Sequence, residues 1–130
     1  MNLAAAIKTV VERRKEIILA ILFGSVGRGS ATPDSDIDIA LLPEEPIAAD
    51  ARMQMMEEIS GVAGRPVDLV DLRQAHGPLL RQILSTGRRL VARDSGALAE
   101  LIGRSLLEQA DFQRHLDYIH QTRRQRWIGV

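Results

Sequence analysis

Residues 24–38 read Gly-Ser-Val-Gly-Arg-Gly-Ser-Ala-Thr-Pro-Asp-Ser-Asp-Ile-Asp, and this stretch decides the fold. It follows the apolar run Ile17–Phe23 and leads into an alternating run over residues 36–42. A short, continuously apolar run that ends at a glycine is typical of a strand buried on both faces, and a buried helix segment is the alternative that the pattern alone leaves open. The stretch therefore predicts two strands joined by a polar loop. A Gly-Ser turn follows the first strand, and an Asp-x-Asp pair begins the second strand.

The second of these strands is expected to have one face that carries aspartates and one face that is apolar. Side chains alternate between the two faces of a strand, so Asp36 and Asp38 point to one face with Ala40, and the intervening isoleucines point to the other. Both carboxylates are therefore expected to point the same way.

Helical and strand patterns alternate along the whole chain, which predicts an α/β (α+β) fold with a mixed sheet flanked by helices. The expected elements are a helix over residues 3–14, strands over 17–23 and 36–42, a helix over 48–62, a strand over 67–72, a helix over 78–86, a strand over 88–93 and a long last helix. The helix over 48–62 is expected to turn inward Ala49, Met53, Met56, Ile59 and Ala63. The seam expected for the last helix is Leu98, Ile102, Ser105, Gln109, Phe112, Leu116 and Ile119.

Composition narrows the class of protein. A chain of 130 residues suits one domain, read as a core over residues 1–94 and a helix with a basic tail over residues 95–130 of the same domain. Seventeen basic and 17 acidic residues cancel, which argues against direct binding of nucleic acid by bulk charge. There is no cysteine, no run long enough to span a membrane and no basic leader, so a cytoplasmic location is expected.

The Asp-x-Asp pair is suited to nucleotidyl transfer. This chemistry requires phosphate charge to be neutralised by hard cations, which prefer carboxylate oxygens, and two such ions serve the attacking and leaving oxygens. Asp36 and Asp38 supply two of the carboxylates, and a third is needed from elsewhere in the chain to complete the site and accept a proton. Asp68 and Asp71 point to opposite faces of their strand, and Asp68 is the stronger candidate because apolar residues flank it within the strand.

The Gly-Ser turn adds a second component. Gly24 and Ser25 follow a buried strand, where backbone N–H groups and a small hydroxyl can reach phosphate oxygens. Alone, each motif has a structural explanation, as a strand-ending turn or a solvated strand edge. In combination they favour a nucleotide-binding site, although the Gly-Lys-Ser/Thr ending of a P-loop is lacking.

These residues together resemble the nucleotidyltransferases of the DNA polymerase beta superfamily, whose signature is Gly-Ser, about ten residues and then Asp-x-Asp. The pattern Phe23-Gly24-Ser25, Ser35-Asp36-Ile37-Asp38 and Gly64-Arg65-Pro66-Val67-Asp68 is similar to the minimal members of that superfamily. The resemblance covers residues 5–92.

The resemblance implies a polymerase-beta-like fold, ATP as the nucleotide donor and two Mg²⁺ ions. It implies that Gly24 and Ser25 hold the triphosphate, that Asp36 and Asp38 bind both metals, and that Asp68 binds one metal and helps to activate the acceptor. Arg28 stands where the family usually has arginine, and two roles remain open for it, contact with phosphate or bracing of the loop. Gly27 is a departure, since the family often has alanine there.

Minimal members are similar to antitoxins paired with HEPN ribonuclease toxins, which attach AMP to a tyrosine of the toxin. The resemblance thus implies an antitoxin adenylyltransferase with a cognate HEPN toxin as partner and a possible oligomer with it. Two alternatives share the same sequence: an antitoxin that only masks the toxin, and a nucleotidyltransferase acting on a small molecule such as an antibiotic.

The segment over residues 97–130 leaves three uses open: packing within the chain, dimerisation or contact with a partner. Its apolar residues Phe112, Leu116, Ile119 and Trp127 are interpreted as core or interface rather than as a platform for a nucleotide. The arginine-rich stretch 123–127 fits a solvated helix end, with contact to a partner or to RNA as the alternative.

Overall fold

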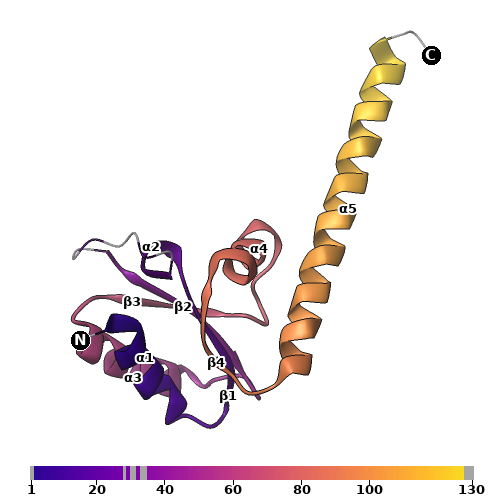
Figure 1. The fold of residues 1–130 in the computed structure, drawn as a ribbon. Helices are drawn as coiled ribbons and strands as arrows, with labels where there is room; N and C mark the ends of the chain where they lie inside the picture. Colours follow the sequence, from indigo (N-terminus) through magenta and orange to yellow (C-terminus); the bar gives the residue numbers. More distant parts are fainter. Residues whose placement is uncertain (1, 28, 30–31, 33–34, 128–130) are drawn as a thin grey trace.

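The computed structural model describes residues 2–27, 29, 32 and 35–127, which form a sheet flanked by helices (Figure 1). In chain order the elements are α1 (Leu3–Glu12), β1 (Ile17–Phe23), α2 (Gly24–Gly27), β2 (Ile37–Pro43), α3 (Ala49–Ala63), β3 (Val67–Asp71), α4 (Gly77–Thr86), β4 (Arg88–Ala92) and α5 (Ser95–Trp127).

The sheet has four strands in the order β3-β2-β1-β4. β1 pairs antiparallel with β2 and with β4, whereas β2 pairs parallel with β3. The helix α3 makes the crossover that a parallel pair needs. The predicted mixed sheet is therefore confirmed. Its parallel pair, β2 and β3, carries Asp38 and Asp68.

Helices cover both faces of the sheet, and the strand β1 is buried between them (Figure 1). On the α1–α3 face, Ala20 and Leu22 of β1 pack with residues of α1 and α3. On the α4–α5 face, Leu19, Ile21 and Phe23 of β1 pack with residues of α4 and with Leu101 of α5. This double burial explains why β1 is apolar without alternation.

The inward face of α3 differs from the prediction. Met53 is 59% exposed, whereas Met55 and Ile59 are buried against the α1–α3 face of the sheet. Met56 and Ala63 are only partly buried against the same cluster. The residues Met55 and Ile59 stand four apart and so share one face of a helix, which centres the buried stripe two residues after Met53.

The base of α5 is fixed to the segment between β3 and α4. One guanidinium nitrogen of Arg104 donates to the backbone carbonyls of Leu72 and Ala75, each at 2.8 Å. The Glu108 carboxylate accepts from the N–H of Gly77 at 2.8 Å and lies 3.1 Å from Nδ1 of His76. The hydrogen bond from Gly77, and after it the one with His76, lowers the pKa of Glu108. The charged form of Glu108 therefore stabilises the start of α4.

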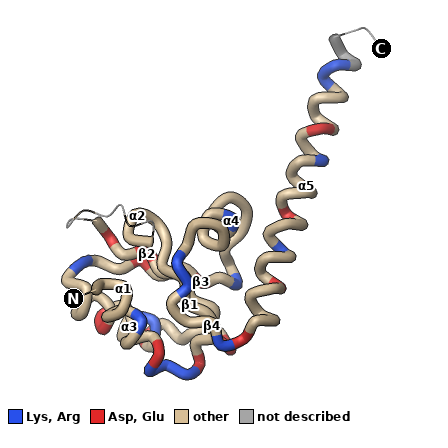
Figure 2. The backbone as a smooth tube through the Cα atoms, viewed as in Figure 1, with Lys and Arg blue, Asp and Glu red and all other residues tan. Residues whose placement is uncertain are grey.

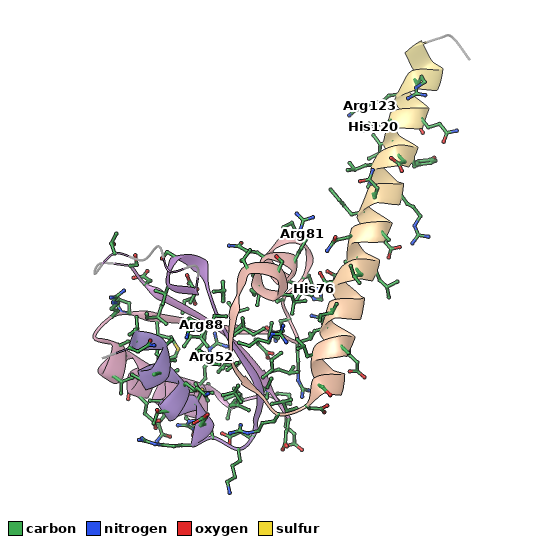
Figure 3. The ribbon with its side chains drawn as sticks, viewed as in Figure 1. Arg52, His76, Arg81, Arg88, His120 and Arg123 are labelled. Atoms are coloured by element: carbon green, nitrogen blue, oxygen red, sulfur yellow. The ribbon has the colours of Figure 1, made fainter. Side chains whose placement is uncertain are left out.

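Beyond this base, α5 projects away from the rest of the molecule (Figure 1). Figure 2 shows that charged residues of both signs follow one another along this projecting part, and Figure 3 places His120 and Arg123 on it. Phe112 is 63% exposed, so its interpretation as core is wrong and only a role at an interface is left of that prediction. The side chain of Trp127 lies outside the described residues.

No helix within the described part of the chain is long and apolar enough to cross a membrane.

Candidate active site

Two carboxylates stand side by side on neighbouring parallel strands. In the register of β2 with β3, Asp38 is the partner of Asp68. Ile39 and Leu69, which follow them, both enter the α1–α3 core cluster. By alternation, Asp38 and Asp68 therefore lie on the α4–α5 face of the sheet.

Asp36 joins this pair from the segment that leads into β2. It is exposed and directly precedes Ile37, the first residue of the strand. Partial burial, and after it the charges of Asp68 and Asp36, raises the pKa of Asp38 above its ordinary value. Asp36 and Asp68 thus each lie close enough to Asp38 to oppose its negative charge.

The Gly24–Gly27 turn begins against the carboxylate of Asp38. Gly24 has a φ of 70°, and a Cβ built on it would overlap Oδ2 of Asp38 and stand 3.3 Å from Cγ. A side chain at this position would therefore meet both a strained backbone and the carboxylate. Only glycine lets the exit of β1 approach Asp38 this closely, which brings the half-buried Ser25 beside the site.

Gly27 is constrained by a different contact. A Cβ on Gly27 would meet the carbonyl group of Leu22, whose carbon would be 2.9 Å away. The alanine that the related family often has here would require this turn to shift. The glycine is therefore matched to the tight packing of α2 on the end of β1.

The donor set fits hard divalent cations, because Asp36, Asp38 and Asp68 offer carboxylate oxygens and no softer ligand. Within the described residues, no three acidic, histidine or cysteine side chains are already gathered as a metal cluster. A metal site at this position would therefore need the three carboxylates to turn toward one point, which the charge of a cation favours and their own repulsion opposes.

The structure brings together most of the residues that the sequence singled out. Gly24, Ser25, Asp36, Asp38 and Asp68 lie at one end of the sheet. Arg28 lies outside the described residues, so neither of its two roles is tested. Asp71, the alternative third carboxylate, pairs with Leu41 farther along the strands, and its Oδ1 accepts from the N–H of Arg73 at 2.9 Å.

One residue beside the site was not singled out. The guanidinium of Arg65 donates to the backbone carbonyl of Thr32 at 3.0 Å, in the connection between the Gly-Ser turn and Asp36. Its signal in the sequence is its place in Gly64-Arg65-Pro66, immediately before the strand that carries Asp68.

An apolar cleft of about 310 Å³ lies elsewhere, between α4 and α5. Pro78, Ser105 and Phe112 are among its lining residues, and Figure 3 shows His76 and Arg81 on the α4 side. Asp36, Asp38 and Asp68 do not line this cleft, so the chemistry that they suggest belongs to a more open surface, where Asp36 and Asp68 are exposed.

Most of the chain matches a known family. Residues 5–96 match the family described as polymerase beta, nucleotidyltransferase. The match contains the Gly-Ser turn and all three aspartates of the site.

Among curated proteins, the chain is 33% identical over 90 residues to the protein adenylyltransferase MntA of Shewanella oneidensis. This match covers 69% of the chain and 65% of the relative, so it spans slightly less than two thirds of the relative's length.

Among solved structures, the chain is similar to one described as a toxin–antitoxin with AMP-PNP, with a TM-score of 0.70 and 27% identity over 90% of this chain and 98% of that one. It is also similar to a chain in a complex of tri-AMPylated Shewanella oneidensis HEPN toxin with MNT antitoxin. There the TM-score is 0.63 and the identity 28%, over 92% of this chain and 96% of that one. Because more than 85% of each chain is covered, the likeness extends beyond the sheet into α5.

Proposed function

This chain belongs to the polymerase beta nucleotidyltransferase family, and from that premise we propose that it transfers AMP from ATP to a hydroxyl of a cognate HEPN toxin. The acceptor we propose is a tyrosine, and the transfer neutralises the toxin, so the chain acts as an antitoxin. The similarity to a protein named as an adenylyltransferase and to an antitoxin bound to an AMPylated toxin supports this proposal.

The observation that carries the proposal is the pairing of Asp38 with Asp68 beside a glycine that cannot be replaced without displacing a carboxylate. A structural role for Asp38 is a weak explanation, because burial and then the charges of Asp68 and Asp36 raise its pKa and so oppose its charged form. Clustered carboxylates of this kind are characteristic of sites that bind cations or move protons.

In the proposed reaction, the acceptor oxygen forms a bond to the α-phosphorus of ATP while the bond from that phosphorus to pyrophosphate breaks. Gly24 and Ser25 hold the triphosphate at the exit of β1, with Arg28 as a further binding residue. Asp68 accepts the proton of the attacking hydroxyl. The acceptor, the nucleotide and the carboxylates meet on the α4–α5 face of the sheet.

Asp36, Asp38 and Asp68 are the residues that would hold two Mg²⁺ ions. When bound, the ions supply charge neutralisation at the phosphates and alignment of the attacking and leaving oxygens. The hard oxygen donors of the three side chains support this assignment.

The test uses the chain purified with its toxin and ATP labelled at the α-phosphate. Wild type is expected to label the toxin in the presence of Mg²⁺, whereas Asp38→Asn is expected to lose transfer and keep its fold. Asp71→Asn is the matched control, because it makes the same change on β3 away from the site. Transfer by Asp38→Asn at the rate of the control would overturn the assignment.

The exposed apolar residues of α5 support a second candidate, an antitoxin that masks the toxin without chemistry. Four of these side chains are 60–67% exposed: Leu106, Leu107, Phe112 and Tyr118. Exposed apolar side chains of this kind are typical of surfaces that bind partner proteins. Protection of cells by an Asp36→Asn, Asp38→Asn double variant would favour masking, and loss of protection with the complex intact would favour transfer.

A further inference from the structure

Asp36 lies outside the regular hydrogen bonding of the sheet. β2 begins at Ile37, so no strand pairing holds the backbone of Asp36 itself. Asp38, in contrast, is paired on both sides, with Phe23 of β1 and with Asp68 of β3. The position of Asp36 relative to the other two carboxylates must therefore depend on local contacts.

Two contacts bracket Asp36, and both come from the residues that lead into β3. On one side, the N–H of Ile37 donates to the carbonyl of Pro66 at 2.9 Å. On the other, Nη1 of Arg65 donates to the carbonyl of Thr32 at 3.0 Å. The adjacent residues Arg65 and Pro66 thus hold the chain before and after Asp36.

The contact at Thr32 acts on a residue that is hydrogen-bonded to Ser35. The N–H of Ser35 donates to the carbonyl of Thr32 at 3.0 Å, and the N–H of Thr32 donates to Oγ of Ser35 at 2.9 Å. The Thr32 carbonyl therefore accepts from both Ser35 and Arg65, which its two lone pairs allow. Since Ser35 is bonded directly to Asp36, a shift of Thr32 and Ser35 would also move Asp36.

We propose that Arg65 is a positioning residue for the carboxylate site: by holding the hydrogen-bonded pair Thr32 and Ser35 near the start of β3, it fixes Asp36 beside Asp38 and Asp68. The proposal rests on the proposed function for its consequence, but the positioning itself is a property of the chain alone. A hydrogen bond from a charged guanidinium is stronger than one between neutral groups, which suits a single contact to this task.

Arg73 provides a matched control on the same pair of strands. Its guanidinium donates to the carbonyls of Pro43, at 2.6 Å, and Glu44, at the opposite end of β2. Arg65 and Arg73 therefore make the same kind of contact, from arginine to backbone carbonyl, one beside the carboxylates and one away from them. Their alanine variants separate positioning of the site from general stabilisation of the β2–β3 pair.

The first experiment measures hydrogen–deuterium exchange of the metal-free chain in wild type, Arg65→Ala, Arg65→Lys and Arg73→Ala. In Arg65→Ala, the amides of Ser35 and Ile37 are expected to exchange about 10-fold faster or more, as loss of a hydrogen bond to a charged group implies. Arg65→Lys is expected to restore part of the protection, because lysine keeps a charged donor. Arg73→Ala is expected to leave these amides unchanged.

The second experiment compares the rate of AMP transfer with equilibrium binding of AMP-PNP. A displaced Asp36 is expected to lower kcat by about 10-fold to 100-fold in Arg65→Ala, the range that misplacement of reacting groups produces. Binding of AMP-PNP in the absence of divalent cations is expected to stay within about twofold of wild type.

Two outcomes would overturn the proposal. Unchanged exchange at Ser35 and Ile37 in Arg65→Ala would show that the hydrogen bond from Arg65 to Thr32 does not hold these residues in place. Weakened cation-free binding of AMP-PNP with unchanged exchange would make Arg65 a nucleotide ligand instead. If wild type transferred no AMP to any toxin, the proposed function would fail while the exchange measurement still decided the role of Arg65.

Discussion

At the scale of the residue, Gly24 links the fold to the proposed chemistry. Its positive φ lets β1 turn sharply, and its missing side chain leaves the space that the Asp38 carboxylate fills. The Gly-Ser motif pointed to this turn, but the sequence alone could not show that a carboxylate lies against Gly24, because that contact joins two strands across the sheet.

Replacement of Gly24 by alanine is expected to abolish AMP transfer and to lower stability by about 1–3 kcal/mol through backbone strain. Gly29→Ala is the control, because Gly29 has a similar φ of 74° but a Cβ there would meet nothing within 4 Å. Gly29→Ala is expected to show the strain without the loss of transfer. The check is urea unfolding beside the transfer assay, and full activity in Gly24→Ala would contradict the role assigned to the contact.

The charge on Asp38 is costly to the folded chain in the absence of a cation. Burial and the charges of Asp68 and Asp36 raise the pKa of Asp38 above its ordinary value of 3.8. The folded state therefore holds this proton more tightly than the unfolded state, and the contribution of Asp38 to stability falls as the pH rises through the raised pKa.

Asp38→Asn is accordingly expected to raise the melting temperature of the metal-free chain at pH 7. The gain is expected to vanish below pH 3.8, where the wild-type carboxyl is protonated in both states. Thermal unfolding of both variants in EDTA across this pH range tests the prediction. A gain that stayed constant with pH would contradict an electrostatic origin.

At the scale of the element, the strands followed from the sequence more closely than the helices did. The unbroken apolar run of β1 reports its burial on both faces directly. The alternation of residues 36–42 holds only at the start of β2, since Ala40 and Leu42 are buried on the same face as Asp38. Helix faces were less certain, since the stripe of α3 centres on Met55 and Ile59 rather than on Met53. The one-turn helix α2 was expected only as a turn, because four residues carry no periodicity.

The base of α5 contributes one side chain to the core, whereas other apolar side chains of this helix are exposed. Leu101 is 6% exposed and packs on the α4–α5 face, whereas Leu107 of the same helix is 66% exposed. Leu101→Ala is expected to lower the free energy of unfolding by about 2–4 kcal/mol, and Leu107→Ala by less than about 0.5 kcal/mol. Equal effects in urea unfolding would contradict this packing.

At the scale of the whole molecule, the site is assembled from one end of the sheet while α5 extends away from it (Figure 1). The sequence predicted a long last helix but not where it would stop packing, because an apolar seam reads the same whether it meets this chain or another one. Only the fold shows that Phe112 stays 63% exposed at the edge of the cleft between α4 and α5.

Removal of residues 110–130 is therefore expected to lower the free energy of unfolding by less than the loss of about 2–4 kcal/mol expected for Leu101→Ala. Arg104 and Glu108, which fix the base of α5, remain in the shortened chain. Urea unfolding of the full and shortened chains makes the comparison. A large loss of stability would show that the projecting part supports the fold.

The most direct test of the central claim is the intact mass of the toxin that co-purifies with this chain, measured before and after incubation with ATP and Mg²⁺. A gain of one or more AMP groups on the toxin, absent when Asp36→Asn replaces wild type, is the predicted result. An unchanged toxin mass in a stable complex with the wild-type chain would contradict adenylyl transfer and leave masking as the function.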